Sequence, residues 1–295
     1  MKDARERAFV AAGNLAAVQS ETIYTAVSMD QPTPKPSHKT RSRRKTIVLL
    51  ILALFLLPVA ARAALYAYEG GPRSWRDADW SSTHSLPRAA DYPDARILVM
   101  NGRTGGWKGV VALHSWIVFK RAGAAEWTRY DVVGWGNPVR RNGYPPDGRW
   151  YGNNPSVLAD ISGARAEALI PKIEQAVRGY QYAHAGDYRI WPGPNSNTFV
   201  ASVLRAVPEL GVTMPPNAIG RDFRPLPYAG LSDSGTGIEA SVWGLVGVKL
   251  GWVEGVEVNV LGLVAGLDLR QPALKLPAFG RIGFESAVAT AAPAK

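Results

Sequence analysis

An uncharged apolar segment near the N-terminus constrains this chain more than any other feature. Residues 46–61 read TIVLLILALFLLPVAA, and the apolar character continues past Arg62 to Tyr68. A helix that crosses a membrane needs roughly 20 apolar residues, so residues 46–68 suffice when the Arg62 side chain reaches the membrane surface. The segment also fits a secretory signal peptide that is cleaved after Ala63, at a small-x-small site. Either interpretation sends the C-terminal part out of the cytoplasm.

The basic residues before this segment predict its orientation. The formal net charge is +10, and several Lys and Arg residues precede the apolar run: Lys35, Lys39, Arg41, Arg43, Arg44 and Lys45. Lys and Arg stay on the cytoplasmic side of a membrane helix, so we expect an inner-membrane anchor with a periplasmic C-terminal domain, or a periplasmic protein after cleavage. Because these residues cluster beside an apolar run and are not spread over a folded face, no nucleic-acid partner is predicted.

The remainder of the chain is long enough to fold around a large core. The whole sequence has 295 residues, of which 46% are hydrophobic. This composition excludes a chain that is disordered over its entire length. The chain has no cysteine, so disulfides, thiolate catalysis and zinc sites with sulfur ligands are excluded. We predict a disordered basic tail at 1–45, the anchor or signal segment at 46–68, a linker or irregular lead-in at 69–94, a globular domain at 95–285 and a disordered tail at 286–295. Translation from Met29 is a further hypothesis.

The pattern of residues 95–285 predicts an α+β fold in which helices pack on an antiparallel sheet. Enrichment in β-branched and aromatic residues indicates strands at 96–101, 110–120 and 126–133, and the last two would form a hairpin. The turn-rich residues 137–154 read as a long loop. From 242 to 283 the chain alternates Val or Leu with Gly and charged residues, which predicts an antiparallel meander.

Two helices are expected between the loop and the meander. Ser162 can cap the first helix, and Pro171 would kink or restart it. Its apolar stripe is predicted to consist of Ala166, Leu169, Ile170, Ile173 and Val177. The second helix is expected at about 197–207, because Pro208 stops it.

His114 and Ser196 are the two residues that could carry chemistry. His114 lies in the strand-like LHSWIVF, and Ser196 lies in WPGPNSNTF at the start of the second helix. The free N–H groups of a helix N-terminus stabilise developing negative charge, which suits a nucleophile, and a histidine beside it would be the general base. The alternatives are structural: Ser196 as a helix cap and His114 as a hydrogen-bonded core residue.

These two motifs resemble known families. An HSW strand followed by PNSNTF at a helix start resembles the circularly permuted papain-like hydrolases of the NlpC type. Residues 95–207, and especially WPGPNSNTFVA, are also similar to an uncharacterised bacterial family with the same membrane-anchored layout. The papain-like resemblance implies that Ser196 occupies the position of the catalytic cysteine, that His114 is the base, and that the backbone N–H of Ser196 or Asn197 faces the oxyanion. The sulfur of that family is missing here.

Further residues are expected around this pair. A hairpin that turns near Gly123 would bring residue 131 or 132 opposite His114, so Asp131 is predicted to orient the imidazole. The predicted substrate-binding residues are mainly aromatic, although packing would also explain them: Trp116, Trp135, Trp150, Tyr151, Trp191 and Asn195. His84, His184 and Asp187 lack the spacing of metal ligands, so neither a metal nor another cofactor is expected.

Two functions from different classes follow from these residues. The first is a hydrolase or acyltransferase that uses Ser196 and His114 on an amide or ester bond of a cell-envelope substrate, such as a peptidoglycan peptide or a lipid. The second is a non-catalytic binding module of the envelope that has kept the groove and lost the chemistry. A serine hydroxyl is far less acidic than a thiol and needs a well-oriented base, so the geometry of the pair discriminates between the two functions.

Overall fold

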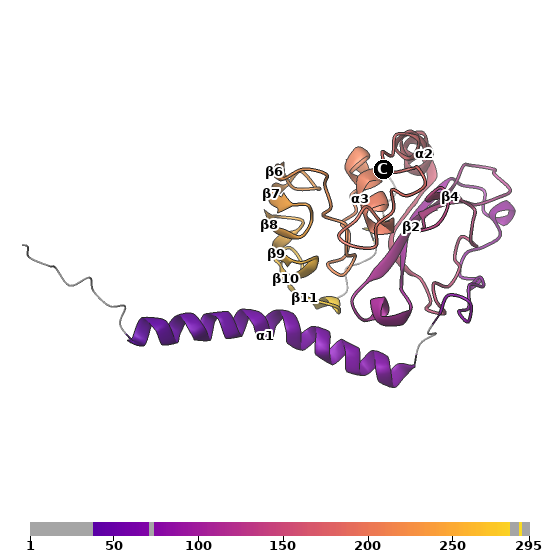
Figure 1. The fold of residues 1–295 in the computed structure, drawn as a ribbon. Coiled ribbons are helices and arrows are strands. Elements are labelled where there is room, and N and C mark those ends of the chain that lie inside the picture. Colours follow the sequence, from indigo (N-terminus) through magenta and orange to yellow (C-terminus); the bar gives the residue numbers. More distant parts are fainter. Residues whose placement is uncertain (1–37, 71–73, 284–288, 291–295) are drawn as a thin grey trace, which may run out of the picture. The chain divides into compact units, whose positions relative to one another are not determined.

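The structure is a computed structural model that describes residues 38–70, 74–283 and 289–290 (Figure 1). Residues 1–37 of the tail predicted at 1–45, the hypothetical start at Met29 and most of the tail predicted at 286–295 lie outside the described residues. The chain divides into residues 1–44 and residues 45–295, and each part is described by itself.

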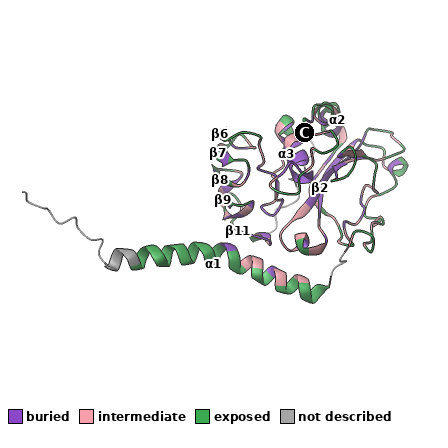
Figure 2. Ribbon diagram, in the orientation of Figure 1, coloured by how far each residue is buried: buried purple, intermediate pink, exposed green. Residues whose placement is uncertain are grey.

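Helix α1, His38–Glu69, contains the apolar segment. It begins at His38, so residues 38–45 are helical and do not belong to a disordered tail. Apolar side chains such as Leu49 and Leu57 are exposed (Figure 2), and the helix is long and apolar enough to cross a membrane or to serve as a signal segment. Near its end, the Arg62 guanidinium forms an ion pair with Glu69, 2.9 Å between Nη1 and Oε2.

The first sheet has the strand order β13-β5-β1-β2-β3-β4. Its strands are β1 (Arg96–Arg103), β2 (Leu113–Lys120), β3 (Thr128–Val132), β4 (Val139–Arg141), β5 (Ser156–Ser162) and β13 (Ala289–Thr290). All pairs are antiparallel except β13 with β5. The three predicted strands are present, but the one expected at 110–120 begins only at Leu113, because Gly106–Val110 forms a 3-10 turn. Strands β4 and β5 were not predicted, and neither was β13, which lies in the tail predicted to be disordered.

Helices α2 (Gly163–Arg178) and α3 (Ser196–Ala206) both pack against the first sheet (Figure 1). The predicted stripe of α2 is confirmed, since its buried residues are the five expected. Pro171 lies inside α2 and does not end it. Ser162 stands at the N-cap position, but its side chain makes no capping hydrogen bond, which corrects the expected cap. Short 3-10 turns occur at Ala89–Asp91 and Pro208–Leu210.

The two faces of the first sheet have different coverings. Under α2 and α3 lies a mainly aliphatic core that includes Ile97, Ile117 and Ala159 and also the aromatic Phe199. The opposite face carries Trp116 and a second, aromatic-rich core. The predicted lead-in and the 137–154 loop cover this face together: the buried Asp147 carboxylate accepts hydrogen bonds from the lead-in, for example from the Ser82 hydroxyl at 2.6 Å. The described part of the lead-in at 74–94 and the loop are therefore fixed parts of the domain.

The second sheet is the predicted meander, which begins earlier than expected. Its seven strands pair in chain order. They are β6 (Tyr228–Leu231), β7 (Gly237–Val242), β8 (Val246–Gly251), β9 (Gly255–Val260), β10 (Leu263–Asp268), β11 (Ala273–Leu276) and β12 (Gly280–Gly283). The α+β class with antiparallel sheets and packed helices is therefore confirmed.

The buried face of the second sheet is charged. Glu239, Lys249 and Glu257 lie opposite one another on β7, β8 and β9, and each is at most 6% exposed. The Lys249 ammonium lies 2.7 Å from Oδ1 of Asp222 and 3.0 Å from Oδ2 of Asp233. Burial alone would lower the pKa of Lys249, but the neighbouring carboxylates outweigh burial and raise this pKa above its ordinary value. Lys249 is therefore the central cation of the face.

We expect Lys249→Met to lower the free energy of unfolding by about 3–5 kcal/mol, because buried carboxylates such as Asp222 lose their cation. Urea unfolding followed by tryptophan fluorescence measures the change. Lys172→Met is the matched control: its ammonium pairs with Glu209 on the surface, where both side chains are about half exposed, and the change should stay within about 1 kcal/mol. Equal losses in the two variants would contradict the assignment.

Candidate functional site

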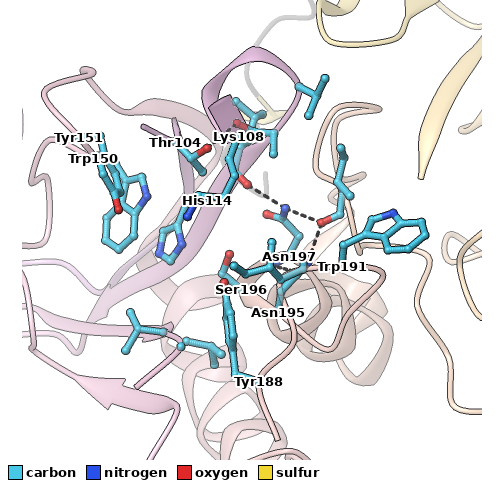
Figure 3. A pocket seen from close by; sticks show the side chains of 18 of the residues that line it. Thr104, Lys108, His114, Trp150, Tyr151, Tyr188, Trp191, Asn195, Ser196 and Asn197 are labelled. Atoms are coloured by element: carbon cyan, nitrogen blue, oxygen red, sulfur yellow. Dashed lines mark hydrogen bonds between the residues drawn. The ribbon is translucent and has the colours of Figure 1, made fainter. Parts of the chain in front are cut away.

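A pocket with a volume of about 440 Å³ opens beside the N-terminus of α3 (Figure 3), which is within the usual range for small-molecule sites. His114 and Ser196 both line it. Most of the remaining wall is apolar and includes Val111, Leu113, Val133, Ile190, Ile219 and Leu263. Among the described residues, no group of three His, Asp or Glu side chains is arranged as metal ligands.

His114 is held between an aromatic ring and a carboxylate. Its ring stacks on Trp150, with centroids 3.5 Å apart and planes at 6°, and Figure 3 shows it between Trp150 and Ser196. Its Nε2 atom lies 3.7 Å from Oδ2 of Asp131, slightly beyond hydrogen-bond length. The imidazole is only 4% exposed, and stacking on the indole fixes its plane.

Asp131 reaches His114 through a register different from the one expected. Ile117 pairs with Tyr130, and continuing this register places Asp131 opposite Trp116 and diagonal to His114. The same register places residue 133 directly opposite His114, so the expectation of residue 131 or 132 was wrong, and Asp131 lies two residues from that position. A shift of two keeps the side chain on the same face of the sheet, and diagonal neighbours are still within reach of each other.

Arg129 is a member of the site that the sequence analysis missed. Its guanidinium donates to Oδ2 of Asp131, at 2.8 Å from Nη2 and 3.2 Å from Nε, and lies 4.2 Å from the ring centroid of Trp116. Both Arg129 and Asp131 are at most 1% exposed. The signal that could have found it is the spacing of Arg129 and Asp131, since residues i and i+2 of a strand share a face.

The charges of this group favour a neutral imidazole. Burial lowers the pKa of His114, and the opposing effect of the Asp131 carboxylate does not outweigh it. Burial alone would raise the pKa of Asp131, but His114 and the Arg129 guanidinium bring it below its ordinary value. His114 is therefore uncharged mainly because it is buried, and the nearby Arg129 guanidinium also lowers its pKa.

Asn195, and not Ser196, caps α3. The side-chain oxygen of Asn195 accepts hydrogen bonds from the backbone N–H groups of Asn197 and Thr198, and the Thr198 hydroxyl accepts one from the Asn195 backbone N–H in return. This capping box makes Ser196 the first residue of the helix. Ser196 is thus not needed as a cap, which removes the structural explanation for its hydroxyl.

The capping box also decides which backbone N–H groups are free. The N–H of Asn197 is occupied by Asn195 at 3.0 Å, so it is not available to an oxyanion. In the described part of the chain, neither the backbone N–H nor the hydroxyl of Ser196 makes a hydrogen bond, although Ser196 is only 4% exposed. The oxyanion donor left from the two expected is therefore the Ser196 N–H.

Asn197 joins α3 to β2. Its side-chain nitrogen donates to the carbonyl groups of Leu113, at 2.9 Å, and Ile219, at 2.8 Å, while its oxygen accepts from the Ser115 hydroxyl at 2.8 Å. Leu113 and Ser115 flank His114 on the strand. Asn197 therefore sets the position of Ser196 relative to His114, which is a positioning role rather than contact with an oxyanion.

The predicted substrate-binding residues divide into two groups. Trp135, Trp150, Tyr151, Trp191 and Asn195 line the pocket, whereas Trp116 is fully buried beneath it and has no surface to offer a ligand. The nitrogen and oxygen of the Asn195 side chain are already used within the protein. Of these, Trp135 and Trp191 are about half exposed and therefore accessible to a ligand, as is Trp107, a lining residue that was not predicted.

The fold and the pocket define an α+β domain in which a buried histidine and the N-terminus of a helix line one pocket. Residues 94–223 match the model of a family described as a protein of unknown function, DUF3750. The match contains both His114 and Ser196 and ends before β6. It supports the predicted similarity to an uncharacterised domain. Neither the curated proteins nor the solved structures contain a match to the chain.

The lowered pKa of His114 predicts a specific pH dependence of stability. In the unfolded chain a histidine binds a proton near pH 6.5, whereas folded His114 stays neutral to lower pH. Between these two pKa values the unfolded state binds more protons, so stability falls as the pH falls below about 6.5, by at most about 1.4 kcal/mol per pH unit. His114→Gln should remove this component from urea-unfolding free energies measured at pH 7 and pH 5. His184→Gln, at an 87% exposed side chain, is the control that should retain it.

Proposed function

We propose that the domain is a serine-dependent hydrolase or acyltransferase. The observation that supports this most is that one pocket combines an imidazole beside a buried carboxylate with a helix-starting serine whose hydroxyl has no other partner among the described residues. In this proposal Ser196 is the nucleophile, His114 is the general base and Asp131 is a positioning residue.

In the proposed reaction, His114 transfers a proton both when the acyl-serine forms and when it breaks down. The Nδ1 atom of His114 accepts the proton of the Ser196 hydroxyl while Oγ attacks the carbonyl carbon of an ester or amide. The Ser196 N–H donates to the resulting oxyanion. His114 then protonates the leaving alcohol or amine, which yields an acyl-serine, and water or an acceptor alcohol attacks this acyl group by the same route in reverse. Asp131 faces the opposite ring nitrogen, Nε2.

The substrate is proposed to be an amide or ester of the cell envelope, such as a peptidoglycan peptide or a lipid. The support for this address is α1, which is long and apolar enough to hold the chain at a membrane, together with the basic residues before it, which would keep the N-terminus in the cytoplasm. In this arrangement the domain lies on the periplasmic side. The half-exposed Trp135 and Trp191 would contact the part of the substrate that lies outside the catalytic groups.

The second candidate is a non-catalytic binding module. The observation that favours it is that His114 makes no hydrogen bond to Ser196 among the described residues, although the two line one pocket. A base must come within hydrogen-bond reach of the proton it removes, and this contact often tightens only when substrate binds. The two functions therefore differ in whether Ser196 is reactive.

We expect a serine-directed fluorophosphonate to label the purified chain on Ser196, and peptide mass spectrometry locates the adduct. Ser196→Ala and His114→Gln should each lower the labelling rate at least about 100-fold, as expected when a nucleophile or its base is removed. Ser202→Ala is the matched control, because Ser202 lies on the same helix, outside the pocket, and donates to the Phe199 carbonyl at 2.7 Å. Folded wild-type chain that remains unlabelled would support the binding module.

A further inference from the structure

The second sheet presents an unusual distribution of apolar and charged residues. One face is formed by alternate residues of β6 to β12, from Leu231 to Ile282, and we call it the apolar sheet face. In register across the central strands it contains Ile238, Val246, Val248, Leu250, Val258 and Leu267. These six side chains are 42–63% exposed. The opposite face, which carries Glu239, Lys249 and Glu257, is the buried one.

This arrangement reverses the usual pattern of a sheet with one solvated face, in which the apolar side is buried and the polar side meets water. The reversal extends over several strands, because the buried charged residues are paired with one another across the face. Lys275 Nζ lies 2.5 Å from Oε1 of Glu257, and Arg221 pairs with the other oxygen of the same carboxylate. These charged side chains are therefore buried inside the domain, and none of the residues that the structure describes covers the apolar sheet face.

The exposed area suits a stable protein interface. Eleven Val, Leu and Ile residues of the face are 36–64% exposed: Leu231, Ile238, Val242, Val246, Val248, Leu250, Val258, Val260, Leu267, Leu274 and Ile282. Because a fully exposed side chain of this kind presents on the order of 100–150 Å², together they offer on the order of 550–800 Å². The largest apolar patches on ordinary monomers measure about 300–600 Å², whereas each partner of a standard interface buries about 800 Å². The apolar sheet face is therefore large enough to form one side of a standard protein interface.

We propose that the apolar sheet face binds the same face of a second copy of this chain, so that the two sheets form a sandwich across a two-fold axis. Sheets pack face to face about 10 Å apart when both inner faces are apolar, and a two-fold interface needs only one self-complementary surface. All residues of the face from Leu231 to Ile282 are Gly, Ala, Val, Leu or Ile. Two copies therefore meet without any unpaired charge.

The same composition argues against a membrane surface as the occupant. Protein surfaces that lie on anionic membranes combine apolar residues with Lys or Arg, and the apolar sheet face contains neither. Strand β9 is the middle strand of seven. If the two copies of the face overlap over most of their area, the two-fold axis that relates them passes close to β9. Val258, near the middle of β9, would then lie close to Val258 of the second copy.

Cross-linking of a single introduced thiol tests this proposal in the full-length chain. Because the chain has no cysteine, Val258→Cys gives each copy one reactive group, and a bis-maleimide about 10 Å long spans the distance between packed sheets. In native membranes we expect more than half of the chain to run as a covalent dimer on a denaturing gel. Val248→Cys, on the neighbouring strand, is the second probe if the first variant does not accumulate. Arg178→Cys, on an exposed position of α2, is the control and should stay monomeric.

Each other outcome overturns the proposal. If the Val258→Cys chain stays monomeric but reacts with a water-soluble maleimide, the apolar sheet face is exposed to water and not covered by a second copy. A chain that neither cross-links nor reacts is covered by lipid or by a different protein. Equal cross-linking of Arg178→Cys indicates random collision. Adding Val248→Glu to Val258→Cys should reduce the dimer at least about 10-fold while tryptophan fluorescence stays native, and an unchanged yield would also exclude the interface.

Discussion

The hydrogen bonds of Asn197 are the interaction on which the site depends. They attach the first turn of α3 to the two residues that flank His114 on β2, and so fix a helix terminus beside a strand from a distant part of the sequence. The neighbouring cap by Asn195 leaves Ser196 with its own N–H and hydroxyl unused among the described residues. Buried amides with all their hydrogen-bonding groups satisfied hold such a junction more rigidly than apolar packing does.

The two sheets use charge in opposite ways. Around His114, one buried ion pair of Arg129 with Asp131 is surrounded by aromatic rings, and the pocket beside it is apolar. In the second sheet, a row of alternating charges forms the interior, and the apolar residues face outward. A buried charge is tolerated only with a partner at close range. The segment containing Arg221 and Asp222 provides these partners. It directly follows Ile219, which lines the pocket.

Local patterns predicted most of the elements and the buried face of α2, but not the buried face of the second sheet. The stripe of α2 was predicted completely, because a helix with one buried side has a clear period. Asn195 and Ser196 are both good caps, so only the hydrogen bonds distinguish them. The contact between His114 and Asp131 was expected on a wrong register. The burial of Lys249 could not be predicted, since a strand that alternates Val with Lys or Glu normally buries the Val, and the burial of its charges depends on Arg221 and Asp222.

The protonation state of His114 is suited to a serine, and not to a cysteine, at position 196. A cysteine nucleophile of the papain-like type works as a thiolate beside an imidazolium, which needs a histidine with a raised pKa. A serine reacts as the neutral hydroxyl and needs a neutral imidazole to take its proton. Here burial and the compensation of Asp131 by Arg129 lower the pKa of His114, which is unsuitable for the thiolate pair. The environment of His114 is therefore the one that a serine nucleophile would require: burial is the main cause of the lowered pKa, and the Arg129 guanidinium adds to it.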